Sequence, residues 1–121
     1  MSFVRVASLT DIPTSRGKRV RVGDVSIGLY RIDDHVYAME DVCPHAGYPL
    51  SLGRLEGCVI ACAAHGWPFD VRTGFAPDDA DGFPIPCFAV RLRDDDVEVD
   101  VEQQTNDSKS LRRQHMARTR A

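Results

Sequence analysis

The sequence predicts an all-β fold, an antiparallel β sandwich or barrel that carries an inserted loop-rich subdomain. Short alternating or β-branched segments, separated by turn residues, fill the chain up to residue 42, which is typical of antiparallel strands. Glycine and proline are concentrated between residues 43 and 86, which predicts loops. Two further segments, CFAVRLR and VEVDVE, flank a run of three aspartates and predict a closing hairpin.

The expected strands are short and follow one another closely. In the first part of the chain they cover residues 3–7, 18–22, 25–32 and 35–39, with Asp33 and Asp34 as the turn before the last strand. Such lengths and turns favour a meander or a small barrel. Residues 10–13 predict at most one helical turn, and one strand at 58–62 interrupts the loop-rich segment. No internal repeat is evident.

The chain has 121 residues, the length of one small domain. We expect this domain to cover residues 1–102, with the loop-rich insert at about 41–86, and residues 103–121 to form a disordered basic tail. The net charge is −3, but residues 1–102 hold 10 basic and 17 acidic residues. An acidic domain argues against binding to nucleic acid.

No apolar run approaches the roughly 20 residues that a membrane-spanning helix needs. The first residues, MSFVRVASLT, also lack the charged and then apolar pattern of a secretory signal. We therefore expect a soluble, cytoplasmic protein that does not bind membranes. In that reducing compartment the four cysteines are interpreted as metal ligands or free thiols before disulfides.

Two short pairs of cysteine and histidine are the candidate metal ligands. The first pair is Cys43 and His45, and the second is Cys62 and His65, with sixteen residues between His45 and Cys62. Each pair lies in a segment rich in glycine and proline, and the two segments flank the strand expected at 58–62. Both loops are therefore expected to converge on one point.

These pairs and their flanks, CPHAGYPLSLG and HGWPFDVRTG, resemble the Rieske 2Fe–2S ferredoxin family. The resemblance is dense over roughly residues 35–90. It implies one 2Fe–2S cluster, with Cys43 and Cys62 on one iron and His45 and His65 on the other. It also implies a carrier of single electrons rather than a catalyst, with a reductase and an oxygenase as redox partners.

Two other functions compete with this hypothesis. The chain is also similar to small subunits of assimilatory nitrite reductase, which have this size and fold. A zinc-stabilised interaction module is the second alternative, but zinc sites usually pair cysteine with cysteine at C-x₂₋₄-C spacing. A catalytic oxygenase subunit is rejected, because no residues remain for a second domain with a mononuclear iron site.

Departures from the high-potential branch of the family predict a low midpoint potential. That branch has an extra cysteine in each loop, where this chain has Tyr48 and Ala64, and hydroxyl side chains where it has Trp67 and Phe69. Fewer hydrogen bonds to the cluster sulfurs lower the potential. We expect Trp67 and Phe69 to cover the cluster and exclude water.

Three further residues have structural roles in this hypothesis. Cys58 and Cys87 fall outside the family's ligand pattern, so they are expected to be buried thiols on strands. Asp70 is expected to brace the second loop through its carboxylate.

Overall fold

The computed structural model describes residues 2–43, 47–64, 66–77 and 84–106. These residues form β-strands, connecting loops and two 3₁₀ turns, η1 (Leu9–Asp11) and η2 (Leu50–Leu52). No helix in the described part is long and apolar enough to cross a membrane. The predicted all-β fold is therefore confirmed.

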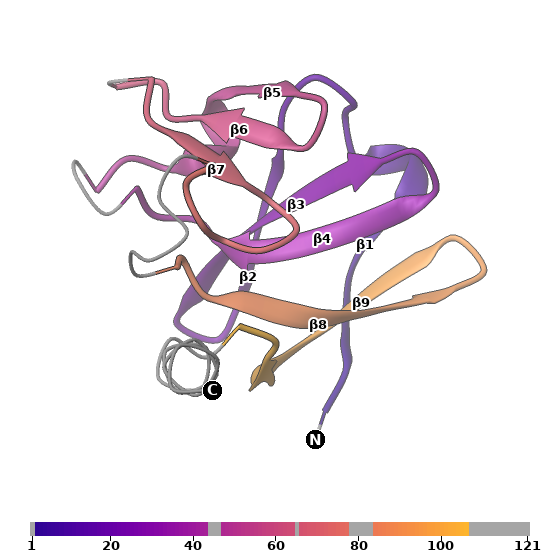
Figure 1. Ribbon diagram of the computed structural model, residues 1–121. Helices are drawn as coiled ribbons and strands as arrows, with labels where there is room; N and C mark the ends of the chain where they lie inside the picture. The colour runs from indigo at the N-terminus through magenta and orange to yellow at the C-terminus, as the bar shows by residue number, and fades with distance from the viewer. Residues whose placement is uncertain (1, 44–46, 65, 78–83, 107–121) are drawn as a thin grey trace, which may run out of the picture.

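The larger of two sheets has six antiparallel strands and is nearly closed into a barrel (Figure 1). Its edge strands, β1 and β2, contact each other. The β1–β9 register shifts at Val6 of β1, and the β8–β9 register shifts where β9 has extra residues between Asp100 and Gln104; such bulges increase twist and help a sheet to curve. In spatial order the strands are β1 (Val4–Ser8), β9 (Asp96–Gln104), β8 (Cys87–Arg93), β4 (His35–Glu40), β3 (Val25–Ile32) and β2 (Lys18–Val22).

Two tight aspartate turns join the hairpins of this barrel. Asp33 follows β3 and Asp94 follows β8, and both have a φ of 55°. Aspartate tolerates this left-handed conformation better than most residues, since its short polar side chain bonds nearby backbone. The predicted turn at Asp33-Asp34 and the predicted closing hairpin are both confirmed.

The smaller sheet lies within the expected insert and has three antiparallel strands, β5 (Arg54–Glu56), β6 (Val59–Ala61) and β7 (Pro68–Asp70). Figure 1 shows it stacked over the β3–β4 side of the barrel. Only β6 corresponds to a predicted strand. The sequences of the other two, RLE and PFD, contain charged residues and a proline and no β-branched residue, whereas CVIAC marks β6.

Buried side chains form two clusters because the central strands are covered on both faces. Ile27 and Leu29 of β3 point into the barrel, while Tyr30 belongs to a second cluster shared with the small sheet. β4 divides in the same way, with Ala38 inside and Met39 outside. Alternate residues of a strand face opposite sides, so these strands bind the two sheets into one domain.

The described structure continues beyond the domain boundary expected at residue 102. β9 continues to Gln104, and Asn106 is buried. The rest of the expected tail, residues 107–121, lies outside the described residues. The proposed division at residue 102 therefore omits at least four residues that are ordered with the barrel.

Candidate metal centre

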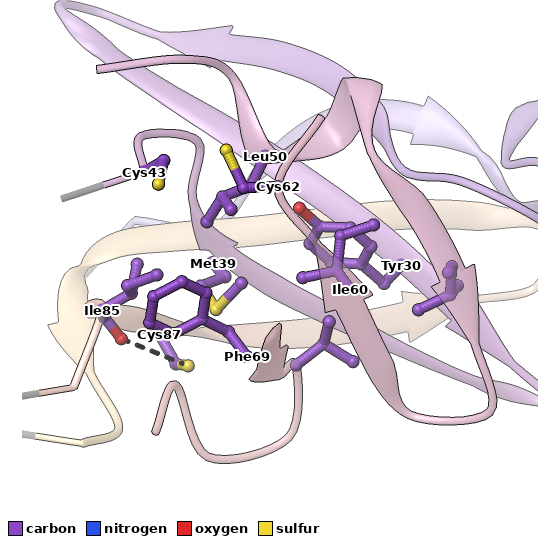
Figure 2. Close-up of a cluster of buried hydrophobic side chains, with 11 residues drawn as sticks. Tyr30, Met39, Cys43, Leu50, Ile60, Cys62, Phe69, Ile85 and Cys87 are labelled. Atoms are coloured by element: carbon purple, nitrogen blue, oxygen red, sulfur yellow. Dashed lines mark hydrogen bonds between the residues drawn. The ribbon is translucent and has the colours of Figure 1, made fainter. Parts of the chain in front are cut away.

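Two of the four expected ligands lie at the base of two loops. Cys43 comes three residues after the end of β4, and Cys62 follows β6 directly; both side chains are buried. They belong to the cluster between the sheets, and Figure 2 shows both sulfurs on one edge of it, with Met39 and Phe69 drawn between them and Cys87. None of the four cysteines forms a disulfide.

The first loop closes through two backbone hydrogen bonds around Cys43. The N–H of Cys43 donates to the carbonyl oxygen of Tyr48 at 2.8 Å, and the N–H of Gly47 donates to the carbonyl oxygen of Cys43 at 2.8 Å. Gly47 has a φ of 69°, a conformation that glycine adopts without strain. The loop is thus a closed turn with a buried thiol at its base.

The second loop repeats this geometry. The N–H of Cys62 donates to the carbonyl oxygen of Trp67 at 2.9 Å, and the N–H of Gly66 donates to that of Cys62 at 2.7 Å. Gly66 has a φ of 70°. In each loop, therefore, a glycine four residues after the cysteine and an aromatic residue five after it complete the turn.

The equivalence of the two loops also has a signal in the sequence. Each loop contains a cysteine, then any three residues, then Gly-aromatic-Pro, as CPHAGYP at 43–49 and CAAHGWP at 62–68. The expectation that the chain has no internal repeat was therefore wrong for this short motif. The histidines obscure it, because His45 is two residues after its cysteine and His65 is three.

The two histidines fall outside the described residues. Among the residues that are described, no three His, Cys, Asp or Glu side chains come together as a metal site. The four-residue ligand set therefore stays a prediction. The donor set nevertheless fits a 2Fe–2S cluster, because two matched loops bring two buried thiols to one face and the sequence of each loop contains one histidine.

The rim of the two loops is apolar and exposed. Tyr48 is 52% exposed and Trp67 is 44% exposed, at equivalent positions of the two loops. Val42 and Leu52, beside the first loop, are exposed as well. Of the two aromatic residues expected to cover the cluster, Phe69 is buried in β7, whereas Trp67 presents much of its surface to solvent.

Asp70 braces the segment after β7, as expected. Its carboxylate accepts hydrogen bonds from the backbone N–H of Arg72 at 2.9 Å and from the guanidinium of Arg72 at 3.1 and 2.8 Å. The side-chain hydrogen bonds from Arg72 hold the pKa of Asp70 below its usual value. The Asp70 carbonyl also accepts the N–H of Gly74 at 2.8 Å.

Asn106 clamps three backbone segments beneath the loops and was not singled out from the sequence. Its Oδ1 accepts the N–H of Cys87 at 2.6 Å, while its Nδ2 donates to the carbonyls of Thr73 at 2.7 Å and Ile85 at 2.8 Å. A buried amide that makes three bonds to separate segments fixes their spacing. Asn106 thus ties the end of β9 to the start of β8 and to the segment after β7.

The two remaining cysteines differ from each other. Cys87 is buried on β8, as predicted, and its burial raises the pKa of its thiol to about 12. Cys58 precedes β6 in a turn and is only half-buried. The prediction of a buried strand thiol was therefore wrong for Cys58, because β6 begins one residue later than expected.

Known proteins match this chain in sequence over most of its length. The Rieske [2Fe–2S] domain family matches residues 2–88. Ferredoxin CarAc of Metapseudomonas resinovorans is 36% identical over 98 residues, which cover 80% of this chain and 92% of the relative. The ferredoxin component of biphenyl 2,3-dioxygenase from Rhodococcus jostii (strain RHA1) is 34% identical over 102 residues, 84% of this chain and 95% of the relative.

Solved structures agree with these matches. A chain in the complex of reduced oxygenase and oxidized ferredoxin of carbazole 1,9a-dioxygenase has a TM-score of 0.75 at 33% identity, over 87% of this chain and 97% of that chain. A putative nitrite reductase small subunit has a TM-score of 0.71 at 23% identity, over 82% of this chain and 98% of that chain. The latter is a likeness of fold alone.

The family implies a 2Fe–2S cluster and leaves the zinc module without support. From the matched loops, the family match and the ferredoxin relatives together, we conclude that this chain belongs to the Rieske [2Fe–2S] family.

Proposed function

We propose that this chain is the ferredoxin component of an oxygenase system, receiving single electrons from a reductase and passing them to the oxygenase. The ferredoxin component of a biphenyl dioxygenase supports this role, as does the ferredoxin–oxygenase complex of a carbazole dioxygenase. This chain covers nearly the full length of both. The observation that carries the proposal is the pair of equivalent loops that bring Cys43 and Cys62 to one face.

In this proposal Cys43 and Cys62 hold one iron, and His45 and His65 hold the other. A bound 2Fe–2S cluster of this kind accepts and releases one electron at a time. Buried thiol ligands keep water away from the sulfur side, where Phe69 and Leu50 belong to the same buried cluster. We expect a partner to approach from the side of the imidazole ligands.

The exposed aromatics at the rim support contact with a protein partner. Tyr and Trp are enriched in protein interfaces because they combine a large apolar surface with a polar group. Tyr48 and Trp67 occupy equivalent places on the two loops, so a docked partner would touch both while it lies next to the imidazoles. We also propose a cytoplasmic location, since four cysteines without a disulfide suit a reducing compartment.

Rapid mixing with candidate partners tests this function. The reduced protein should be reoxidised by the oxidised oxygenase of a carbazole or biphenyl dioxygenase system at a rate that saturates with oxygenase concentration. Trp67→Ala should raise the oxygenase concentration needed for half the maximal rate while leaving the visible spectrum unchanged. Leu92→Ala is the control, because Leu92 is an exposed apolar residue on β8, and it should leave this concentration unchanged. Absence of electron transfer, together with stable co-elution with a nitrite reductase large subunit, would overturn the proposal in favour of that alternative.

The ligand set is tested by replacing a histidine. His65→Ala should abolish the visible and EPR spectra of the mixed-ligand cluster, whereas His35→Ala should leave them intact, because His35 is exposed on β4. A His65→Ala protein with the unchanged spectrum would remove His65 from the ligand set.

A further inference from the structure

A buried carboxylate lies two residues before the first cysteine of the metal centre. Asp41 is 1% exposed, and it comes directly after β4. Its backbone N–H donates to the carbonyl oxygen of Ser26 on β3 at 2.9 Å, which anchors the residue to the barrel. Aspartate is seldom buried unless its oxygens are paired, so the partners of this carboxylate define its role.

Ser51 supplies two hydrogen bonds to this carboxylate. Its N–H donates to Oδ1 of Asp41 at 2.7 Å, and its hydroxyl donates to Oδ2 at 2.6 Å. Ser51 is itself buried in η2, and its carbonyl accepts the N–H of Gly17 at 3.2 Å. The pair therefore joins the two ends of the segment 42–50, which contains Cys43 and His45.

The positive charge beside Asp41 is displaced toward solvent. The Nε of Arg19, on β2, lies 3.7 Å from Oδ2 of Asp41, and the Arg19 side chain is 47% exposed. Arg19 also donates to the hydroxyl of Ser26 at 3.2 Å. Both oxygens of Asp41 thus accept a hydrogen bond from Ser51, and Arg19 supplies the nearby positive charge. Its negative charge is buried, whereas the compensating charge is partly in water.

We infer that Asp41 is a positioning residue that closes the first ligand loop and whose charge keeps the midpoint potential of the cluster low. This inference rests on the proposed role of Cys43 and His45 as ligands. Reduction adds one negative charge to the cluster, and a negative charge fixed nearby in the low-dielectric interior opposes it. Arg19 acts in the opposite sense but more weakly, because solvent and salt screen it.

Asp41→Asn removes the negative charge of Asp41 while keeping the shape of its side chain. Asparagine has nearly the same size, and it retains an oxygen to accept the Ser51 N–H and gains an N–H₂ group that can donate to the Ser51 hydroxyl. The cluster should therefore stay in place, with an unchanged ratio of iron to protein, while its midpoint potential rises. An unchanged or lower potential in a variant that retains the full cluster would overturn the electrostatic part of the inference.

Arg19→Gln gives an independent test on an exposed side chain that should not endanger folding. The midpoint potential should fall, and the fall should shrink as the salt concentration is raised. Arg21→Gln is the matched control, because Arg21 is exposed two residues further along the same strand. Equal shifts for Arg19→Gln and Arg21→Gln would show a general surface effect and contradict a specific role for the Asp41–Arg19 pair.

Ser51→Ala tests the closure of the loop. This variant retains the Asp41 charge but loses the 2.6 Å hydrogen bond, so the cluster should be lost to a chelator several-fold faster without a rise in potential. A cluster as durable as that of the unmodified protein would contradict closure by this pair. Failure of the inference is distinguishable from failure of the proposed function, since a chain without a cluster would show no midpoint potential in the unmodified protein.

Discussion

The N–H of Gly66 donates a 2.7 Å hydrogen bond to the carbonyl oxygen of Cys62, and Gly47 makes the same bond to Cys43. Both glycines have positive φ, and a Cβ at either position would meet no atom of the described residues within 4 Å. Glycine is therefore needed at both positions for the backbone conformation. This makes the two turns the part of the fold on which the metal centre depends.

Replacing either loop glycine with alanine should damage the cluster more than the fold. Left-handed backbone costs a residue other than glycine about 1–2 kcal/mol. Gly57→Ala is a matched control, because Gly57 also has positive φ with nothing near its Cβ and lies in the β5–β6 turn. All three variants should lower the unfolding temperature similarly, but only Gly47→Ala and Gly66→Ala should shorten the lifetime of the visible absorption. Equal lifetimes in all three would contradict this role of the turns.

Asn106→Ala should destabilise the whole domain. It leaves the N–H of Cys87 and the carbonyls of Thr73 and Ile85 without their side-chain partner, and each buried group left unpaired costs about 1–3 kcal/mol. We expect a loss of at least about 2 kcal/mol in chemical denaturation. Thr105→Ala is the control, because it shortens an exposed side chain at the preceding residue and keeps the backbone hydrogen bond from Thr105 to Cys87. It should cost less than about 0.5 kcal/mol, and a loss similar to that of Asn106→Ala would contradict the role of the Asn106 side chain.

Tyr30→Phe should be neutral or stabilising. The hydroxyl of Tyr30 is buried and has no hydrogen-bond partner among the described residues, and burial raises its pKa, so it stays protonated. Removal of an unpaired buried hydroxyl relieves a desolvation cost of about 1–3 kcal/mol, while the ring keeps its packing. A loss of more than about 1 kcal/mol on denaturation would show that a bound water or another group pairs with this hydroxyl.

Alkylation should distinguish the two non-ligand cysteines. Because burial raises the pKa of Cys87 to about 12, only about 10⁻⁴ of it is thiolate at pH 8, and thiolate is the reactive form. Iodoacetamide should therefore label half-buried Cys58 first, as read by mass spectrometry, and both residues after denaturation. The pKa of Cys87 is higher in the folded protein than its ordinary value of 9.0, so its burial stabilises the fold below about pH 9. This contribution to the free energy of unfolding declines as the pH rises toward 12. Equal labelling of Cys58 and Cys87 in the folded protein would contradict this account.

The barrel strands could be predicted from sequence because each has a clear local pattern. Residues 25–32 were matched by β3 without error, and 35–39 differs from β4 by one residue. Turn residues bound these strands, and alternation along them reflects burial on two faces. The strands β5 and β7 were missed because neither contains a β-branched residue, so only pairing with β6 defines them.

The metal centre was predictable only in part. Cysteine and histidine are scarce, so their spacing along the chain was enough to single out Cys43 and Cys62. Asp41 and Ser51 are ten residues apart, and Asn106 bonds segments 19 to 33 residues away. Such long-range hydrogen bonds leave no local pattern, because any polar residue at those positions resembles an ordinary surface residue.

The most direct test of the account is the EPR spectrum of the protein reduced with dithionite. Ligation of one iron by two thiolates and of the other by two imidazoles should give the low average g value of a mixed histidine–cysteine 2Fe–2S cluster. The average g value of an all-cysteine cluster would contradict the ligand set. The absence of a signal in anaerobically purified protein that contains zinc, but neither iron nor acid-labile sulfide, would contradict the metal centre itself.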